Sequence, residues 1–322
     1  MMKNTLKFTM LLWAVIMPFS SGVCETLPRP VVPDASAQAC AVLEYIYSVN
    51  GEFVLSGQHG AKETEYVHSC TGRYPAILGQ DLIHEDKNEE VISNTIKWWR
   101  AGGIPTLMWH WGAPGKGPGY ENSKKGIDIE RCFQTGTPEY EALWTDLRRI
   151  ADHLTVLRDA DVPVLWRPMH ECDGNWFWYG KGTGEQFCRV WRLMFDYFTK
   201  ERKLNNLIWV LCHSGEPKPE FNPGEGYYDL AGADSYNTER IREEMYRKVQ
   251  AIHGDKKPVP YHECGTIPDP DMCAEAGVNW SWWMLWSGEH AKAFDQNELR
   301  RLYAHDKVIT FEELPDIMDL NR

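Results

Sequence analysis

The most informative segment of the chain is an apolar run that ends in polar residues, and it reads Val162-Pro163-Val164-Leu165-Trp166-Arg167-Pro168-Met169-His170-Glu171. Its first half has the short, apolar character of a buried strand. The preceding stretch, Pro138–Ala160, carries Leu and Ile at three- and four-residue spacing and predicts an amphipathic helix. A helix followed by a buried strand is a repeating unit of α/β folds.

Seven further runs resemble this one, and the complete set is Phe53–Gly57, Pro75–Gly79, Ile104–Trp109, Val162–Arg167, Leu207–Leu211, Leu230–Ala233, Val259–Tyr261 and Trp280–Trp286. Stretches with helical periodicity separate them, including Val91–Ala101, Gly184–Arg202 and Glu239–Ile252. This alternation, with no linker rich in Pro, Gly or Ser, predicts an α/β fold of the (β/α)8 TIM barrel type in a single domain. A doubly wound sheet would carry a Gly-rich phosphate loop after its first strand, and Gly57-Gln58-His59-Gly60 is not one.

The overall charge limits the kinds of partner. The 322 residues include 34 Lys and Arg against 46 Asp and Glu, which gives a formal net charge of −12. Nucleic acid affinity rests on clustered Lys and Arg that neutralise phosphates, so we expect no nucleic acid partner. A neutral or weakly charged ligand fits better. The hydrophobic fraction of 43% excludes a disordered chain.

The first 24 residues predict a signal peptide. Lys3 and Lys7 precede an apolar stretch over 8–19, and small residues follow it. Cys24 follows Ser21-Gly22-Val23, which loosely resembles a lipoprotein cleavage box, so a lipid anchor at Cys24 is an alternative to plain export. The apolar stretch is too short to span a bilayer comfortably, and we expect no transmembrane segment. Residues 25–322 are then an exported domain, which is secreted, periplasmic or held at the cell surface, and which we expect to be a monomer.

Chemically versatile side chains stand where the predicted strands end. They are His110 after the third run, Arg167, His170 and Glu171 after the fourth, Asp234 and Tyr236 after the sixth, Glu263 after the seventh, and Trp286 at the end of the eighth. Functional residues of a (β/α)8 barrel lie at the carboxyl ends of its strands. We therefore expect these side chains to meet at one mouth of the barrel. The long loop over 112–136, rich in Gly, Pro and Lys, is expected at the same mouth.

Glu171 and Glu263 form the most specific pair in this set. They end the fourth and seventh predicted strands, so they face each other across the barrel mouth. Paired carboxyl groups are the minimal equipment for glycoside hydrolysis, in which one protonates the leaving oxygen and the other attacks the anomeric carbon or activates water. The pair therefore points to a glycosidase.

Other hydrolytic chemistries fit less well. His170-Glu171 and His262-Glu263 lack the second His of H-E-x-x-H, and the chain has neither a C-x-x-C pair nor a G-x-S-x-G motif. We therefore expect neither a metal nor a cofactor. Eight cysteines follow residue 24 and their pairing stays open, although Cys172, Cys212 and Cys264 lie in or beside apolar runs and are expected as small buried residues.

The segment around the first glutamate resembles the acid/base signature of glycoside hydrolase family 26, a clan A family typified by β-mannanases, and it reads Arg167-Pro168-Met169-His170-Glu171-Cys172-Asp173-Gly174-Asn175-Trp176-Phe177-Trp178-Tyr179-Gly180. Four further segments are similar to that family, namely 108–111, 232–236, 262–265 and 283–286. The resemblance implies a retaining endo-β-1,4-mannanase. It assigns the general acid/base to Glu171 and the nucleophile to Glu263.

The resemblance and the chemistry together suggest roles for the neighbouring residues. The two carboxyl groups need pKa values pushed in opposite directions, and Arg167 and Tyr236 are placed to keep Glu263 ionised. Trp176 is expected to form an apolar wall that favours protonated Glu171. The residues expected to bind substrate, largely through the resemblance, are His110, Arg167, His170, Trp176, Asp234, Tyr236 and Trp286, the last by stacking on a sugar. Seven tryptophans near the ends of the third, fourth and eighth runs are expected to line this face, namely Trp109, Trp111, Trp176, Trp178, Trp282, Trp283 and Trp286.

Two alternatives to a mannanase stay open. A hydrolase of the same mechanism could act on β-1,3-xylan or mixed-linkage β-glucan, because the sequence gives no direct view of the pocket for the sugar 2-hydroxyl. A catalytically inactive carbohydrate-binding barrel would keep the tryptophans, but it would have no reason to keep both Glu171 and Glu263. The sequence also leaves endo against exo action undecided.

Overall fold

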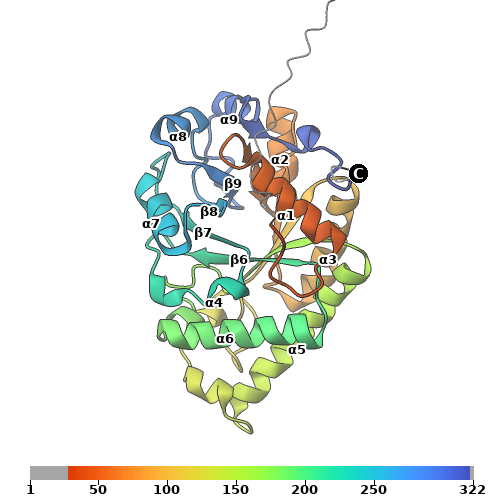
Figure 1. Ribbon diagram of the computed structural model, residues 1–322, viewed down its shortest axis with the longest axis vertical. Helices are drawn as coiled ribbons and strands as arrows, with labels where there is room; N and C mark the ends of the chain where they lie inside the picture. Colours follow the sequence, from red (N-terminus) through yellow and green to blue (C-terminus); the bar gives the residue numbers. More distant parts are fainter. Residues whose placement is uncertain (1–27, 320–322) are drawn as a thin grey trace, which may run out of the picture.

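Eight parallel strands close into a barrel in the computed structural model, which describes residues 28–319 (Figure 1). They are β2 (Gly57–His59), β3 (Ile77–Asp81), β4 (Ile104–Trp109), β5 (Val164–Pro168), β6 (Leu207–His213), β7 (Leu230–Ser235), β8 (Val259–Cys264) and β9 (Trp280–Leu285). Each strand pairs with the next along the chain, and pairing of Gln58 with Leu285 closes the circle between β2 and β9. The predicted (β/α)8 barrel is confirmed. The predicted signal peptide, Cys24 included, lies outside the described residues.

Helices surround the barrel, and they are α2 (Ala61–Thr71), α3 (Asn88–Arg100), α5 (Pro138–Asp159), α6 (Gly184–Asp196), α7 (Glu243–His253), α8 (Pro270–Ala276) and α9 (Gln296–Tyr303). Their starts follow local chemistry, since Thr137 and Thr183 accept hydrogen bonds from the first turns of α5 and α6. Gln186 completes a capping box with Thr183. No helix within residues 28–319 has the length and apolar character needed to cross a bilayer.

Shorter helical segments lie mainly in the loops. They are α4 (Tyr120–Ser123), a π-helical turn that continues α6 (Tyr197–Glu201), and the 3-10 turns Glu85–Lys87, Ile129–Phe133, Trp178–Gly180, Pro219–Phe221, Glu225–Tyr227 and Phe311–Glu313. The predicted helices agree with α3, α5, α6 and α7 within a few residues, except that the predicted end of α6 is the π-helical turn.

The first predicted strand is divided in two. The run Phe53–Gly57 contains β1 (Val54–Leu55), which pairs with β10 (Val308–Ile309) and with β9, and only then does β2 begin. Ser56 separates them because its backbone N–H and its hydroxyl both donate to the carbonyl of Ile309. The other seven predicted runs each overlap one barrel strand, so the alternation of apolar runs with helical stretches predicted the barrel correctly.

Helix α1 (Ala37–Val49) closes the amino-terminal end of the barrel, and Figure 1 shows it crossing in front of the strands. Its buried residues Val42 and Ile46 share one apolar cluster with Ile77 and Ile104, which lie at the starts of β3 and β4. Apolar side chains therefore fill this end of the barrel.

Most tryptophans at the strand ends belong to the core. Of the seven expected to line the functional face, five are buried, namely Trp109, Trp111, Trp178, Trp282 and Trp283. The prediction is therefore wrong for these five. Side chains alternate along a strand, so Trp283 packs in the cluster shared with α7 and α9, whereas Trp282 belongs to the cluster shared with α1. Trp176, 38% exposed, and the partly exposed Trp286 remain at the surface.

The cysteines contribute to packing as thiols. All eight cysteines in the described part of the chain are free. Cys172, Cys212 and Cys264 are fully buried, as predicted, and burial raises the pKa of the Cys212 thiol to about 12. These thiols are protonated at neutral pH and behave as small apolar side chains.

The contrast between core and surface tryptophans gives a stability prediction. Trp209 of β6 packs against Trp191 and Phe195 of α6, with ring centroids 5.5 and 5.0 Å away. Trp209→Ala should lower the free energy of unfolding by about 3–5 kcal/mol, because it leaves a large cavity. Trp176→Ala should lower it by less than about 1 kcal/mol. Denaturant unfolding measures both, and equal losses would contradict this division.

Candidate active site

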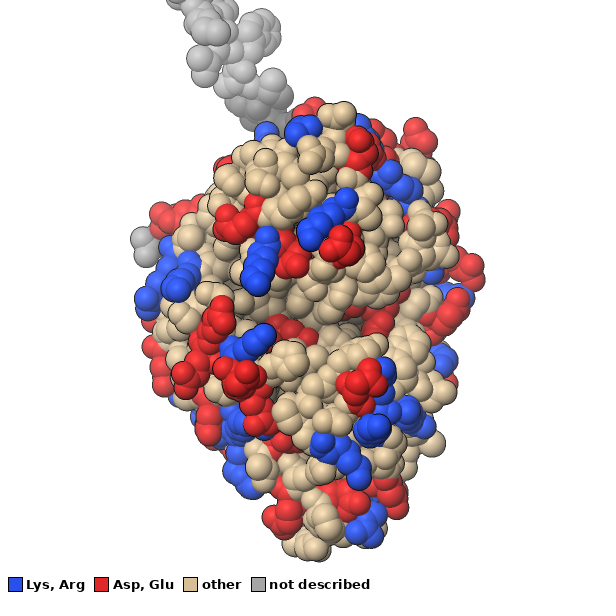
Figure 2. Space-filling view, turned by 180° about the vertical axis from the view of Figure 1, so that it is seen from behind, with Lys and Arg blue, Asp and Glu red and all other residues tan. Residues whose placement is uncertain are grey.

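A cleft of about 500 Å³ opens at the carboxyl ends of the strands, and it is lined by His59, Asp81, Ile83, His110, Tyr120, Glu171, Phe177, Tyr236, Glu263, Trp286, Ser287 and His290. Five residues predicted from the sequence are among them: His110, Glu171, Tyr236, Glu263 and Trp286. Figure 2 shows the face opposite to that of Figure 1, which is hollowed near its middle with Asp and Glu side chains in and around the hollow. The expected meeting of strand ends at one mouth is therefore found.

Glu171 extends from a tight loop that follows β5. Its backbone has φ of +50°, and that of Met169 has φ of +49°, values that side chains other than Gly seldom adopt. The indole N–H of Trp176 donates to Oε2 of Glu171 at 2.6 Å. Burial raises the pKa of Glu171, while this hydrogen bond opposes the rise. The expectation that Trp176 favours protonated Glu171 is therefore wrong, because the indole contacts the carboxylate through its N–H.

Glu263 lies near the end of β8 and is buried, with 3% of its surface exposed. The Tyr236 hydroxyl, which follows β7, donates a hydrogen bond to its Oε1. Burial, reinforced by the nearby charge of Glu171, raises the pKa of Glu263 to about 7. Arg167 and Tyr236 act in the predicted direction and lower it, but they do not offset burial. The pKa values of Glu171 and Glu263 are thus both raised, instead of shifting in opposite directions.

Arg167 acts from beneath the cleft and does not line it. Its guanidinium is fully buried, donating from Nη1 to the carbonyl of His262 at 2.6 Å and from Nε to Oγ1 of Thr106 at 3.1 Å. It therefore ties β5 to β8 next to Glu263 while its charge favours the ionised form of that carboxyl.

Asp234 connects the two glutamates electrostatically. It is buried on β7, and the burial together with the charges of Glu171 and Glu263 raises its pKa well above the ordinary range. The hydrogen bond between Asp234 and Glu171 raises the pKa of Asp234 and lowers that of Glu171, so the protonated form of Asp234 acts as the donor and favours ionised Glu171. It lies behind the cleft wall and does not line the cleft.

His110 has a carboxylate partner that the sequence did not indicate. Its Nδ1 hydrogen-bonds Asp81 at the end of β3, and its backbone N–H donates to the same carboxylate at 3.0 Å. Burial opposes protonation, but Asp81 outweighs it by charge and hydrogen bonding and raises the pKa of His110. The ring of His59 stacks on Trp286 with centroids 4.1 Å apart, so one face of Trp286 is already covered.

His170 is placed behind the surface of the cleft. It is fully buried, and its ring packs edge-on against His110 and tilted against Phe177, with centroids 4.3 and 5.0 Å away. Burial lowers the pKa of His170 well below its usual value, so it is neutral. In this structure it supports His110, and its contact with substrate stays a prediction.

Seven residues that line the cleft were not predicted, namely His59, Asp81, Ile83, Tyr120, Phe177, Ser287 and His290. His59 and Asp81 end β2 and β3, two residues beyond the ends of the predicted runs, so longer strands would have revealed them. Tyr120 opens α4 within the loop over 112–136, and its ring lies edge-on to His110 at 5.6 Å. The position of a single loop residue cannot be predicted from sequence periodicity, although the loop itself was expected at the mouth.

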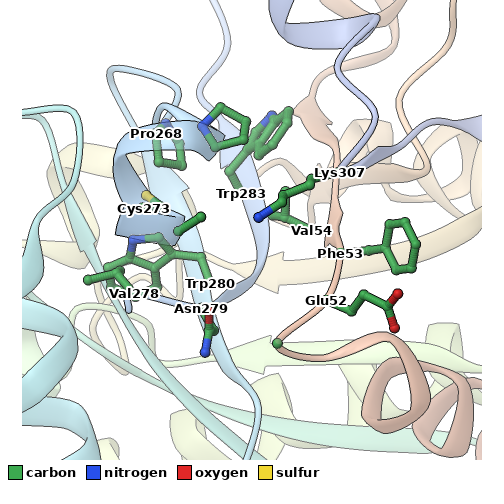
Figure 3. A pocket seen from close by; sticks show the side chains of 13 residues that line it. Glu52, Phe53, Val54, Pro268, Cys273, Val278, Asn279, Trp280, Trp283 and Lys307 are labelled. Carbon is green, nitrogen blue, oxygen red and sulfur yellow. The ribbon is translucent and has the colours of Figure 1, made fainter. Parts of the chain in front are cut away.

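A second, smaller cavity of about 160 Å³ lies beside α8, next to the starts of β1 and β9 (Figure 3). Pro268, Val278 and Trp280 supply apolar walls, with Lys307 and Glu52 at its edge. None of the site residues predicted from the sequence lines it, so the chemistry points to the larger cleft.

The strand ends of this parallel barrel bring two glutamates into one cleft, and a tyrosine hydroxyl hydrogen-bonds one of them. This arrangement defines a barrel of the glycoside hydrolase class. A family model described as Glycosyl hydrolase family 26 matches residues 31–313. The chain therefore belongs to this family and is a glycoside hydrolase.

Curated relatives agree with this membership. A mannan endo-1,4-β-mannosidase of Thermothelomyces thermophilus is 30% identical over 340 residues, which cover 95% of this chain and 69% of that protein. Mannan endo-1,4-β-mannosidase B of a Piromyces species is 29% identical, covering 89% of this chain and 54% of that protein. The chain thus spans between half and about two thirds of these relatives.

Solved structures share the fold along nearly the whole chain. A Podospora anserina GH26-CBM35 β-(1,4)-mannanase superposes with a TM-score of 0.82 at 27% identity, covering 93% of this chain and 72% of that one. A β-mannanase from a symbiotic protist of the termite Reticulitermes speratus, solved with a gluco-manno-oligosaccharide, gives 0.79 at 28% identity and covers 89% of this chain and 98% of that one.

The pairing of His110 with Asp81 predicts a change in protonation. Asp81→Asn removes the carboxylate that raises the pKa of His110 and leaves burial, which lowers it. At pH 6.0 we expect the His110 ring to be protonated in the wild type and neutral in the variant. Long-range ¹H–¹⁵N spectra of histidine-labelled protein measure this, and a neutral wild-type ring would contradict the assignment.

Proposed function

We propose that this protein is a retaining endo-β-1,4-mannanase, with Glu171 as general acid/base and Glu263 as nucleophile. The observation that carries the proposal is the position of the two carboxyl groups. Both line one cleft at the strand ends, and the Tyr236 hydroxyl hydrogen-bonds Glu263. The names of the relatives support mannan as the substrate, as does the gluco-manno-oligosaccharide held by one structural neighbour.

The proposed reaction is a double displacement. In the first step a carboxylate oxygen of Glu263 bonds to the anomeric carbon while the glycosidic bond breaks, and Glu171 gives its proton to the leaving oxygen. In the second step Glu171 takes a proton from water, whose oxygen attacks the anomeric carbon and releases Glu263 as a carboxylate. Protons and electron pairs balance over the two steps, and no other reagent is consumed.

The raised pKa values fit this division of labour. Two carboxyl groups with raised pKa values in one buried cleft favour a state in which one is protonated and the other ionised. The hydrogen bond from Tyr236 and the charge of Arg167 lower the pKa of Glu263, whereas hydrogen bonds from Asp234 and Trp176 lower that of Glu171. The first step requires the proton on Glu171 and the negative charge on Glu263.

The other cleft residues suit an uncharged sugar chain. Trp286 presents the ring face that His59 leaves uncovered, and apolar ring faces stack on sugars. Tyr120 and His110 lie near it with polar groups suited to hydroxyls. Binding of mannan by His110, His170, Asp234 and Trp286 is part of this proposal. A polymeric substrate also agrees with export of the protein, which stays a prediction.

A substrate panel tests the proposal. The wild type is expected to release reducing ends from β-1,4-mannan, and NMR of the first product should show the β-anomer, since two displacements retain configuration. Glu263→Gln should lower the rate at least about a thousandfold, because the amide is a poor nucleophile. Glu201→Gln, an exposed residue that precedes the start of β6 and does not line the cleft, is the matched control and should leave the rate unchanged.

The same panel separates the alternatives. Cleavage of β-1,3-xylan or mixed-linkage β-glucan with mannan left intact would overturn the substrate assignment. Binding of mannan without cleavage of any glycan would instead indicate an inactive carbohydrate-binding barrel. An α-anomer as the first product would exclude the retaining mechanism.

The pKa of Glu263 predicts the pH dependence. Glu263 must be ionised to attack, so kcat/KM should fall as pH drops through about 7. Tyr236→Phe removes a hydrogen bond that lowers this pKa, so the acid limb should move to higher pH and activity at pH 6 should fall more than activity at pH 8. The kcat/KM profile measures this shift, and an equal loss at both pH values would contradict it.

A further inference from the structure

Asp173, two residues after Glu171, is a buried carboxylate with an unusually complete set of donors. Its Oδ1 accepts from the backbone N–H and the hydroxyl of Ser214, both at 2.8 Å. Its Oδ2 accepts from the backbone N–H of Lys218 at 2.9 Å and from Nδ1 of His213 at 2.7 Å. Asp173 therefore fastens the loop after β5 to the end of β6 and the loop that follows it.

The fastened loop is the one that holds Glu171 in a strained conformation. Met169, Glu171 and Asn175 all have positive φ, at +49°, +50° and +66°. Residues in such conformations are strained and persist only when their surroundings over-determine them. Other bonds of this loop are single: the Cys172 N–H donates to the Cys212 carbonyl, and the Tyr179 hydroxyl donates to the His170 carbonyl at 2.9 Å. The four bonds of Asp173 are the dense anchor of this loop.

The anchor continues into a buried hydrogen-bonded chain, named here the histidine chain, whose members are Asp173, His213, His253, Tyr228 and Glu225. Nε2 of His213 lies 2.8 Å from Nε2 of His253. Nδ1 of His253 lies 2.9 Å from the Tyr228 hydroxyl, and this hydroxyl donates to Glu225 at 2.6 Å. The chain ends at the surface, where Lys257 pairs with Glu225 at 2.7 Å.

Counting protons along the histidine chain gives a definite result. It has four links, and each link needs one proton between its two heavy atoms. Two neutral imidazoles and one phenol supply only three. Either one link joins two lone pairs at hydrogen-bond distance, which is repulsive, or the chain holds a fourth proton. With all four links made, one histidine is a cation between two carboxylates.

The charges at the ends of the chain agree with the fourth proton. Burial opposes ionisation of Asp173. The hydrogen bond and charge of His213, together with the hydrogen bonds from Ser214, outweigh it and lower the pKa of Asp173, so this carboxyl is ionised. Lys257 and Tyr228 likewise lower the pKa of Glu225. Burial, followed by the charge of His213, lowers the pKa of His253 to about 3. Of the two histidines, His213 is the one whose ring contacts a carboxylate, with Nδ1 2.7 Å from Oδ2 of Asp173.

We propose that Asp173 is a positioning residue for Glu171, and that the histidine chain holds Asp173 in place by carrying one proton more than its neutral side chains supply. The inference rests on the proposed function, because it assigns Asp173 a task in aiming the acid/base. Loss of this anchor lets the strained loop relax and moves the Glu171 proton away from the leaving oxygen.

Leaving-group dependence tests the positioning role. Mannopentaose needs a proton on its leaving oxygen, whereas 2,4-dinitrophenyl β-mannobioside releases a stable phenolate without one. Asp173→Asn is expected to lower kcat/KM at least tenfold on mannopentaose and less than threefold on the aryl glycoside. Ser214→Ala, which removes one donor, should change this ratio in the same direction by a smaller factor.

The control is Asp229, another buried carboxylate, which accepts from the backbone N–H groups of Val31 and Trp209. Asp229→Asn should lower the melting temperature and leave the ratio of the two substrates unchanged. Equal losses on both substrates in Asp173→Asn, or an unchanged ratio in each anchor variant that folds, would overturn the inference. Failure of the wild type to cleave either substrate would refute the proposed function instead, so the two failures are distinct.

Spectroscopy tests the fourth proton directly. At pH 8 the long-range ¹H–¹⁵N spectrum of histidine-labelled wild type should contain a ring with both nitrogens protonated that persists in His110→Asn. Tyr228→Phe removes two links, and the two that remain need only two protons, so this ring should become neutral. If no ring apart from that of His110 is doubly protonated in the wild type, the proton count is wrong.

Discussion

Repulsion among three carboxyl groups, two of them buried and one half-buried, is the constraint on which this site depends. Glu171, Asp234 and Glu263 come from the ends of β5, β7 and β8, and the charges of the two glutamates raise the pKa of Asp234 further than burial alone. Three charges cannot be held together in a poorly solvated cleft. The site therefore distributes protons, and the arrangement of Tyr236, Trp176 and Arg167 decides which carboxyl keeps one. The barrel is what brings the three strand ends together.

The sequence was sufficient for the barrel because its signal is repeated eight times. Each apolar run needed only to be recognised approximately, and errors such as the undivided Phe53–Gly57 did not change the count of strands. Glu263 and His110 could be predicted for the same reason, since each lies at the end of a strand. Asp81 and His59 were missed by two residues, and Tyr120 and Phe177 belong to loops, where no period applies.

The direction of the pKa shifts was less accessible from the sequence. Arg167 and Tyr236 were correctly expected to favour ionised Glu263, but desolvation exceeds both, and desolvation depends on everything packed around the group. For Trp176, likewise, the sequence does not reveal which atom of the side chain faces the carboxyl group. A tryptophan near a carboxyl group predicts an apolar wall, whereas the structure presents the indole N–H to Glu171. Composition cannot tell which edge of a ring faces a charge.

The loop that carries Glu171 explains why charged groups are buried around it. A buried ion pair often adds little stability compared with apolar residues of similar size. Apolar packing, however, has no directional preference, and a loop with three residues at positive φ has to be held at particular backbone groups. The carboxylate of Asp173 bonds the N–H groups of Ser214 and Lys218 with fixed geometry, and these belong to the end of the next strand and its loop. Rigidity of the barrel is thereby transmitted to Glu171 through hydrogen bonds, which fix direction as well as distance.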